Sequence, residues 1–277
     1  MRKTVVVTGC SSGIGRYAAK RLVTLGYKVI ATVRNKADVQ PLQLEGVDHV
    51  VLLDLAESES IQFAVKKILT IADGQVYALF NNAAYGQPGA VEDLTRDSLR
   101  KQFEVNLFGT HELTIRLLPS MLKMEDARII QNSSVLGFVA MPFRGAYNAS
   151  KFALEGLTDT LRLELKSSPV KISIIEPGPI LSRFRQNALK ALEDNVDIQA
   201  SRHAEKYEAA QARLRRDGAA VPFTLGPDAV FSKLIHALES KNPKKRYRVT
   251  LPTYLMAVLR VVMPTGLMDK ILIAGGQ

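Results

Sequence analysis

The stretch Thr4-Val5-Val6-Val7-Thr8-Gly9-Cys10-Ser11-Ser12-Gly13-Ile14-Gly15 decides the fold of this 277-residue chain. Its first four residues are all β-branched, which predicts a short buried strand. Three glycines follow directly, and glycine lets the backbone approach a ligand closely because it has no Cβ. A helix that begins at such a turn presents unpaired N–H groups and the positive end of its dipole. The stretch therefore predicts a strand, a turn and a helix that together bind the diphosphate of a dinucleotide.

The alternation of strand and helix continues through the first two-thirds of the chain. Continuous apolar runs predict further strands buried on both faces at 29–33, 50–53, 76–80, 128–131 and 171–175. Helical periodicity predicts helices over 15–25, 58–71, 97–121 and 147–166, followed later by a helix at 227–240 and a strand at 247–250. This order predicts an α/β fold, a Rossmann-type doubly wound parallel sheet of about seven strands with helices on both faces.

The domain organisation is expected to be simple, because no Pro/Gly-rich linker divides residues 1–277. Residues 182–221 are rich in helix formers and contain no strand pattern. They predict an insertion over the ligand cleft, either a substrate lid or a fixed helical pair. The apolar tail, about 252–277, is expected to pack on the body or to form a wall of the cleft. A peripheral membrane contact and a dimer surface are left open as alternatives.

The composition is that of a protein with an apolar core, since 47% of residues are hydrophobic and 23% are charged. No span of about 20 apolar residues runs without a charge. The one cysteine, Cys10, allows no internal disulfide and is typical of a reducing compartment, so we expect a cytoplasmic protein. The net charge is +10, but the basic residues are dispersed apart from short runs at 213–216 and 244–246. We therefore expect anionic cofactors or acidic membrane surfaces rather than nucleic acid as partners, and we expect no metal.

The end of the second predicted strand, Ala31-Thr32-Val33-Arg34-Asn35, indicates which dinucleotide binds. An NAD site places an acidic side chain there to accept a hydrogen bond from the ribose 2′-hydroxyl. Here Arg34 stands at that position, and no carboxylate follows before Asp38. A guanidinium attracts the 2′-phosphate of NADP, and Ser11 or Ser12 can add a hydroxyl donor. The cofactor is therefore predicted to be NADP (NADPH).

Three residues on and before the predicted helix 147–166 indicate proton-transfer chemistry. Tyr147 and Lys151 are four residues apart and so share a helix face. A nearby ammonium favours the phenolate, so we expect Lys151 to lower the pKa of Tyr147 toward neutrality. Ser134, thirteen residues before the tyrosine, is expected to hydrogen-bond the same substrate oxygen. A tyrosine and a lysine at this spacing are common by chance, so their position after the glycine turn matters.

The chain as a whole resembles the short-chain dehydrogenase/reductase family, and the resemblance covers nearly all of it. The motifs that carry it are Thr8 to Gly15, Asp54 after the third strand, Asn81-Asn82-Ala83-Ala84, Asn106 in Val105-Asn106-Leu107-Phe108-Gly109, Ser133-Ser134, Tyr147-Asn148-Ala149-Ser150-Lys151 and Pro177-Gly178-Pro179-Ile180. Members that look most similar are bacterial NADP-dependent aldehyde reductases, followed by 17β-hydroxysteroid and retinol dehydrogenases.

The resemblance implies a role for each motif residue. Tyr147 is the acid/base, Lys151 also holds the nicotinamide ribose, and Asn106 anchors a water that relays protons to Lys151. Cofactor contacts are implied for the glycine turn with Ile14, for Asp54 and Leu55 beside the adenine, for Asn82 and Ala83 beside the ribose, and for Pro177, Gly178 and Ile180 beside the nicotinamide. One departure is Ala84, where the family usually has glycine, which puts tight cofactor packing in doubt. The family also implies a homo-oligomer.

The predicted reaction is reduction of a lipophilic aldehyde or ketone to an alcohol. The residues expected to face the cleft are apolar or aromatic, namely Tyr85, Val135, Leu136, Phe138, Met141 and Phe143. Such a wall disfavours sugars, whose hydroxyls would be left unpaired. The alternatives are a steroid or retinoid alcohol dehydrogenase running in the oxidative direction and a non-catalytic NADP-binding regulator. A sugar-nucleotide epimerase or dehydratase is disfavoured by the glycine spacing and the chain length.

Overall fold

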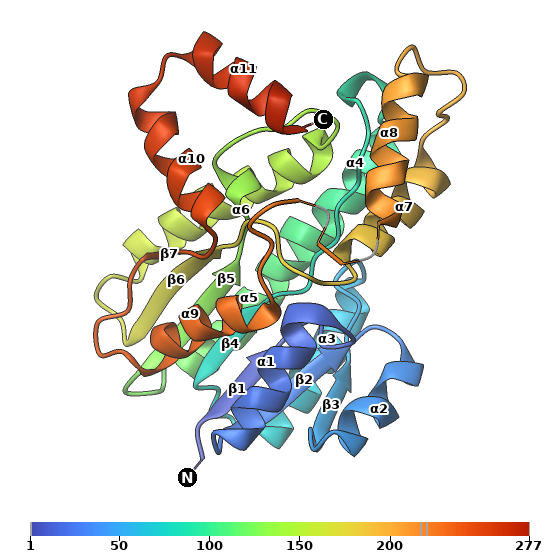
Figure 1. The fold of residues 1–277 in the computed structure, drawn as a ribbon. Coiled ribbons are helices and arrows are strands. Elements are labelled where there is room, and N and C mark those ends of the chain that lie inside the picture. Colours follow the sequence, from blue (N-terminus) through green and yellow to red (C-terminus); the bar gives the residue numbers. More distant parts are fainter. Residues whose placement is uncertain (1, 217, 220, 277) are drawn as a thin grey trace.

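A parallel β-sheet of seven strands forms the centre of the computed structural model, which describes residues 2–216, 218–219 and 221–276. The strand order is β3-β2-β1-β4-β5-β6-β7, so the chain starts in the middle and winds outward to each edge in turn (Figure 1). The strands are β1 (Thr4–Val7), β2 (Lys28–Val33), β3 (His49–Leu52), β4 (Ala78–Asn81), β5 (Ala127–Asn132), β6 (Val170–Glu176) and β7 (Arg246–Arg248). The predicted doubly wound sheet is confirmed, and its strand order reverses between β1 and β4, where such folds bind ligands.

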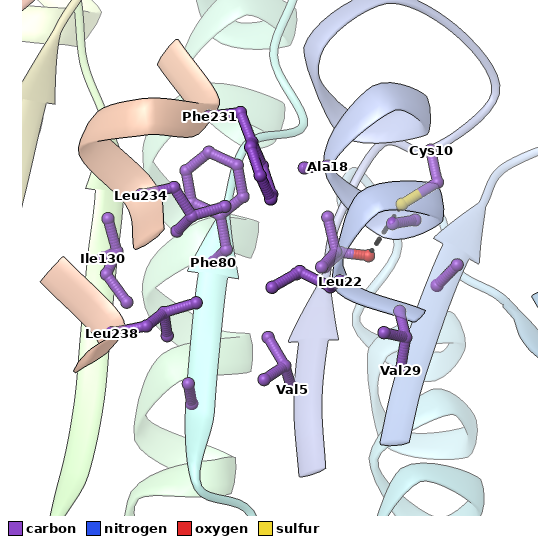
Figure 2. Packing of buried hydrophobic residues seen from close by; sticks show 14 of the residues in the cluster. Val5, Cys10, Ala18, Leu22, Val29, Phe80, Ile130, Phe231, Leu234 and Leu238 are labelled. Atoms are coloured by element: carbon purple, nitrogen blue, oxygen red, sulfur yellow. Dashed lines mark hydrogen bonds between the residues drawn. The ribbon is translucent and has the colours of Figure 1, made fainter. Parts of the chain in front are cut away.

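Helices cover both faces of the sheet because successive residues of each strand point to opposite sides. Val5 and Val7 pack toward α1 (Gly13–Thr24) and α9 (Pro227–Glu239), in the cluster that also holds Phe80 and Leu234 (Figure 2). Val6 faces the other way. The opposite layer consists of α3 (Ser58–Ile71), α5 (Thr110–Met121) and α6 (Gly145–Glu164), with α4 (Arg96–Phe103) beside α6.

Two helical elements differ from the prediction. The single helix expected over 97–121 is divided into α4 and α5 by a π-helical turn, η3 (Glu104–Gly109). The short helix α2 (Val39–Leu44) was not predicted, because six residues that include Pro41 are too few to show a helical period. The strand expected at 247–250 ends earlier, at Arg248, because Thr250 is already the N-cap of the next helix.

The described part of the predicted insertion at 182–221 contains a helical pair over the carboxyl edge of the sheet, α7 (Phe184–Asn195) and α8 (Ala204–Arg215) (Figure 1); residues 217 and 220 of that insertion lie outside the described residues. The pair is fixed to the body by Tyr207, whose hydroxyl donates to Asp93 Oδ2 (2.6 Å) and accepts from Ala90 N (2.7 Å). Leu192 and Val196 complete a small apolar cluster there. The helical content predicted for this segment is confirmed, whereas a lid function stays a prediction.

The C-terminal residues form α10 (Leu251–Val262) and α11 (Thr265–Gly276). Met268 and Leu272 of α11 pack on Leu136 and Phe138, in the loop that leads to α6. The tail therefore packs on the body, as one of its predicted alternatives required. Among the helices of the described residues, none combines the length and the apolar character needed to span a bilayer.

Candidate active site

The glycine turn lies between β1 and α1 at the carboxyl edge of the sheet. Gly9 has φ +72°, and a Cβ at this residue would lie 2.8 Å from Ala83 Cα. Gly13 has φ +55°, and its Cβ would lie 2.9 Å from Ser182 Cβ, just before α7. Any larger side chain would be strained in both places. The turn therefore presents bare backbone at the N-terminus of α1, which is the environment that a diphosphate requires.

Hydrogen bonds from the turn join the ends of three central strands. Thr8 Oγ1 accepts from the backbone N–H groups of Asn82 and Ala83, both at 2.9 Å. The Asn82 amide donates to the Thr8 carbonyl and accepts from Asn132 Nδ2, also at 2.9 Å. Asn82 thus connects β1, β4 and β5. Thr8 and Asn132 are positioning residues that the sequence reasoning missed, and the contact of residues 82–83 with a cofactor ribose stays a prediction.

The structure brings Ser134, Tyr147 and Lys151 together. Tyr147 and Lys151 lie on consecutive turns of α6, with Lys151 Nζ 5.8 Å from the centre of the Tyr147 ring. Ser134 follows β5 and begins a short 3₁₀ turn, where its Oγ accepts from the Leu136 N–H (3.1 Å). Lys151 is 2% exposed and donates to the Asn132 carbonyl (2.8 Å). The predicted set is therefore assembled at one place, beside the end of β5.

The expected lowering of the Tyr147 pKa is wrong for this arrangement. Burial raises the pKa of Tyr147 to about 12, and only the hydrogen bond with Ser134 acts in the opposite direction. Burial also lowers the pKa of Lys151 to about 8, against the attraction of Glu155. The sequence argument considered only the attraction between the ammonium and the phenolate. In the structure, both Tyr147 and Lys151 are shielded from water, and the Lys151 ammonium donates a hydrogen bond to the Asn132 carbonyl.

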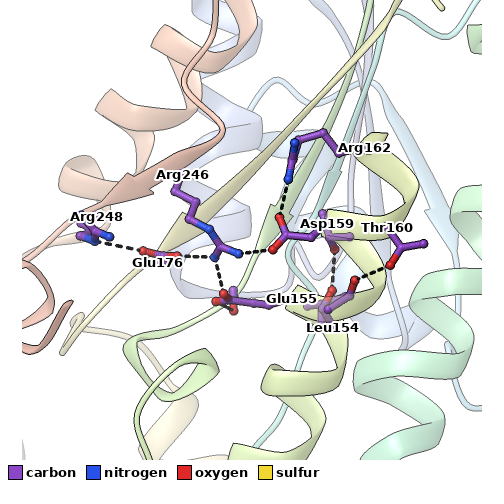
Figure 3. A network of polar contacts seen from close by, with 11 residues as sticks. Leu154, Glu155, Asp159, Thr160, Arg162, Glu176, Arg246 and Arg248 are labelled. Carbon is purple, nitrogen blue, oxygen red and sulfur yellow. Dashed lines mark hydrogen bonds and ion pairs between the residues drawn. The ribbon is translucent and has the colours of Figure 1, made fainter. Parts of the chain in front are cut away.

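Glu155 is a further residue of this helix face that the sequence reasoning missed. Its Oε1 accepts from the Ser133 hydroxyl (2.7 Å), and Arg246 of β7 donates to its other oxygen (Figure 3). Arg246 also binds Glu176 Oε1 (2.7 Å) and Asp159 Oδ2 (2.5 Å). The network joins α6 to β6 and β7, starting one helical turn after Lys151. The four-residue spacing from Tyr147 through Lys151 to Glu155 was a signal for it.

Asn106 is buried within the π-helical turn η3. Its Nδ2 donates to the Tyr85 carbonyl (2.9 Å) and to Ser150 Oγ (3.2 Å), and its Oδ1 accepts from the Tyr85 N–H (3.2 Å). Ser150 directly precedes Lys151, so Asn106 reaches the catalytic helix itself. π-Helical turns are rare and frequent at functional sites. The location is therefore consistent with the proton relay implied for Asn106, which stays a prediction.

The remaining predicted cofactor residues occupy the same edge of the sheet. Arg34 is exposed at the end of β2. Asp54 follows β3, where its Oδ1 accepts from the Ala56 N–H (3.0 Å), and Leu55 beside it is buried. Pro177, Gly178 and Ile180 follow β6, and the Pro177 carbonyl accepts from the Val135 N–H (2.8 Å). Ser11, Ser12 and Ile14 lie in the glycine turn. The structure thus brings all these residues to one edge, without testing their roles.

An apolar pocket of about 670 Å³ lies between the loop before α6 and α11. Met141 and Phe143 line it from the loop, and Leu272 and Ile273 line it from α11. Gly145 and Asn148 are shared with the first turn of the catalytic helix, whereas Ser134, Tyr147 and Lys151 do not line the pocket. The pocket is therefore a neighbour of the set formed by Ser134, Tyr147 and Lys151.

The other predicted cleft residues are arranged differently. Leu136 and Phe138 lie beneath α11, and Val135 packs at the edge of the same cluster. Tyr85 is half-buried, and burial raises its pKa. Above the catalytic residues, Phe184 at the start of α7 meets the Tyr147 ring edge-on, with centroids 5.3 Å apart. Phe184 is thus an aromatic neighbour of Tyr147 that the sequence reasoning did not single out.

Comparisons with known proteins agree with this geometry. The model of the family described as short chain dehydrogenase matches residues 3–193. The uncharacterized oxidoreductase YbbO of Escherichia coli (strain K12) is 42% identical over 272 residues, covering 98% of this chain and 94% of that protein. Human 17-beta-hydroxysteroid dehydrogenase type 1 is 31% identical over 279 residues, covering 96% of this chain and 83% of that protein.

Among solved structures, a short-chain dehydrogenase/reductase from Burkholderia phymatum in complex with NAD has a TM-score of 0.78 and 26% identity. The match covers 94% of this chain and 92% of that chain. The chain therefore belongs to the short-chain dehydrogenase/reductase family. It is an oxidoreductase of the kind that uses a nicotinamide cofactor, as the sequence predicted.

Proposed function

We propose that this oxidoreductase reduces lipophilic aldehydes or ketones to alcohols with NADPH. The observation that carries the proposal is the assembly of Ser134, Tyr147 and Lys151 at the sheet edge that also holds the glycine turn. Bound NADPH would supply a hydride to the carbonyl carbon. Ser134 holds the carbonyl oxygen, and the Tyr147 hydroxyl donates the proton that this oxygen needs.

The protonation state of Tyr147 suits a proton donor. With a pKa raised to about 12 by burial, Tyr147 is protonated at neutral pH and ready to act as a proton donor. Oxidation of an alcohol would require the phenolate as a base. The alternative is a steroid or retinoid alcohol dehydrogenase working by oxidation, in which the Tyr147 phenolate would act as the base. Similarity to a 17-beta-hydroxysteroid dehydrogenase keeps steroids among the substrates to test.

Preference for NADP rests on Arg34. This exposed guanidinium follows β2 at the position where an acidic residue would select NAD, and the next carboxylate along the chain is Asp38. A guanidinium can donate to two oxygens of a 2′-phosphate at once. One solved relative, 26% identical, is in complex with NAD, so the support for NADP in this chain is the residue at this position.

A lipophilic substrate is supported by the apolar pocket beside the catalytic helix. Its walls are mainly side chains such as Met141, Phe143 and Leu272, which offer few partners for hydroxyl groups. A sugar in such surroundings would lose hydrogen bonds to water without replacement, which costs about 1–3 kcal/mol for each unpaired group. Cytoplasmic location, expected from the single cysteine, stays a prediction.

Replacement of Tyr147 by Phe tests the proposed chemistry. The variant keeps the ring that packs on Phe184 but loses the proton donor, so turnover should fall by about 100-fold or more while NADPH binding remains. NADPH consumption measured over graded aldehydes, ketones and steroids gives the activity, and fluorescence titration gives the binding. Tyr17→Phe on α1 is the matched control. Undiminished turnover in Tyr147→Phe would refute the assignment, and no turnover on the whole panel would favour the regulator alternative.

Replacement of Arg34 by Ala tests the cofactor. Loss of a charge-assisted contact worth about 1.5–3 kcal/mol should raise the Michaelis constant for NADPH by roughly 10- to 100-fold and leave that for NADH nearly unchanged. Arg21→Ala in the last turn of α1 removes an equal charge elsewhere and serves as the control. Equal effects of Arg34→Ala on both nucleotides would argue against a 2′-phosphate contact.

A further inference from the structure

A second pocket, of about 460 Å³, lies between the glycine turn and the α7–α8 helical pair. Ser12 and Gly13 border it at the N-terminus of α1, and Ser182 borders it from the chain leading into α7. The remaining wall consists largely of arginines, namely Arg16, Arg183, Arg185, Arg215 and Arg216, and no carboxylate lines the pocket within the described residues. Five cations thus converge on the place where the turn offers its N–H groups.

Two of these arginines are neutralised by ion pairs that lead away from the pocket. Arg16 pairs with Glu45 (2.9 Å), and Arg215 pairs with Glu193 (2.9 Å). Within the part of the chain that the structure describes, Arg183, Arg185 and Arg216 make no such pair. Among the described residues, the pocket therefore holds three arginines without an ion pair, and their charge would attract an anion.

Arg185 is the most informative of the three. Its Nη2 donates to the Gly218 carbonyl, whereas its Nη1 is buried and has no hydrogen-bond partner among the described residues. Its charge is also felt by Arg213 on α8, whose pKa is lowered first by burial and then by Arg185. Buried donors without partners are uncommon because each costs free energy of desolvation. An unpaired guanidinium nitrogen in a wall of arginines indicates a site built for a ligand that accepts hydrogen bonds.

We propose that Arg183, Arg185 and Arg216 clamp the diphosphate of the dinucleotide from the α7–α8 side, opposite the N–H groups of the glycine turn. The inference rests on the proposed use of a nicotinamide dinucleotide and adds residues outside the turn to its binding. A diphosphate carries the charge that the pocket lacks and has enough oxygens for several guanidinium donors. Because NADPH and NADH share this group, the clamp contributes equally to both, in contrast to Arg34.

The experiment compares the dissociation constants of NADPH and NADH, measured by fluorescence titration of the full chain. Arg183→Ala and Arg216→Ala change exposed residues, and Arg185→Lys keeps a charge while shortening the reach to Gly218. The loss of one charge-assisted contact should weaken both nucleotides by about tenfold at each alanine variant, with the ratio of the two constants unchanged. Lys190→Ala removes one charge from the outer face of α7, where Lys190 pairs with Asp194, and should change neither constant.

An Arg183→Ala/Arg216→Ala double variant that binds both nucleotides like the wild type would overturn the clamp and leave the proposed function intact. A selective loss of NADPH affinity would also overturn it, because the arginines would then contact the 2′-phosphate. A wild-type protein that binds neither nucleotide would refute the proposed function itself. Thermal melting of each variant separates loss of affinity from loss of folding.

Discussion

The free energy of unfolding should depend strongly on Arg246, which lies on the edge strand β7. Replacement of Arg246 by Met tests this expectation. Arg246 of β7 is the common partner of Glu155, Asp159 and Glu176 (Figure 3). The side chains of Glu155 and Glu176 are only 7% and 1% exposed. Methionine keeps the length of the side chain but removes the charge, so two buried carboxylates lose their main counter-charge.

The expected loss follows from the burial of these carboxylates. Removing one partner of a buried ion pair typically costs about 3–5 kcal/mol because an uncompensated charge remains inside. The lower end applies here, since the Arg246 side chain is 31% exposed and Arg248 still lies 3.5 Å from Glu176. A loss of about 3 kcal/mol should lower the melting temperature of a chain of this size by roughly 6–12 °C.

The loss should depend on pH in a definite direction. Burial and the nearby Glu176 raise the pKa of Glu155 above its ordinary value of 4.5, whereas Arg246 lowers it. A carboxyl whose folded pKa is raised contributes stability below pH 4.5, and this contribution is lost as the pH rises through the folded pKa. Without Arg246 the pKa of Glu155 rises further. The deficit of the variant should therefore be larger at pH 8 than at pH 5.

The assay is thermal and urea unfolding of Arg246→Met at both pH values, beside Arg162→Met. Arg162 contacts the same Asp159 at 3.1 Å, but on the surface of α6, where an ion pair contributes about 0–1 kcal/mol. The control should melt within about 2–4 °C of the wild type. A deficit for Arg246→Met that is as small as that of Arg162→Met, or equal at pH 5 and pH 8, would refute the reasoning.

Three further predictions concern activity and association. Glu155→Gln removes the charge that raises the pKa of Lys151, so the variant should lose turnover at a lower alkaline pH than the wild type. A pH profile of turnover measures this shift, and an unchanged profile would exclude the positioning role of Glu155. Val258 lies on the exposed face of α10, and Val258→Asp should reduce flotation of the protein with anionic lipid vesicles because it places a charge on this apolar face. A wild-type protein that does not float would contradict the membrane contact left open for the tail. Ile115→Asp, on the exposed face of α5, should convert a homo-oligomer to a monomer in sedimentation analysis, and a monomeric wild type would contradict the predicted oligomer.

Most of the sheet could be predicted because its cause is local. Strands such as Thr4–Val7 and Lys28–Val33 consist almost entirely of β-branched or apolar residues, which is typical of strands that are buried on both faces. The glycine turn and the Tyr147–Lys151 pair are likewise local, since four residues along a helix always return to the same face. The helix 58–71 matched α3 to the residue for the same reason.

The remaining features depend on contacts between distant segments. The pKa of Tyr147 is set by burial that spacing alone does not reveal. Arg183 and Arg216 are far apart in the chain, and basic residues such as these are typical of solvated helix faces. The pairing of α7 with α8 brings both residues to the pocket beside the glycine turn. Glu155 lies on a predictable face, but its partner Arg246 comes from β7, 91 residues further on.

The π-helical turn η3 has a consequence for how this chain tolerates insertions and deletions. A π-turn contains about one residue more than an α-helical turn. Deleting Phe108 would therefore allow a continuous α-helix from α4 to α5, in which Asn106 no longer lies in a widened turn. Asn106 would then turn away from Tyr85 and Ser150. A one-residue deletion that makes the helix regular should thus keep the fold while displacing Asn106 from its contacts with Tyr85 and Ser150.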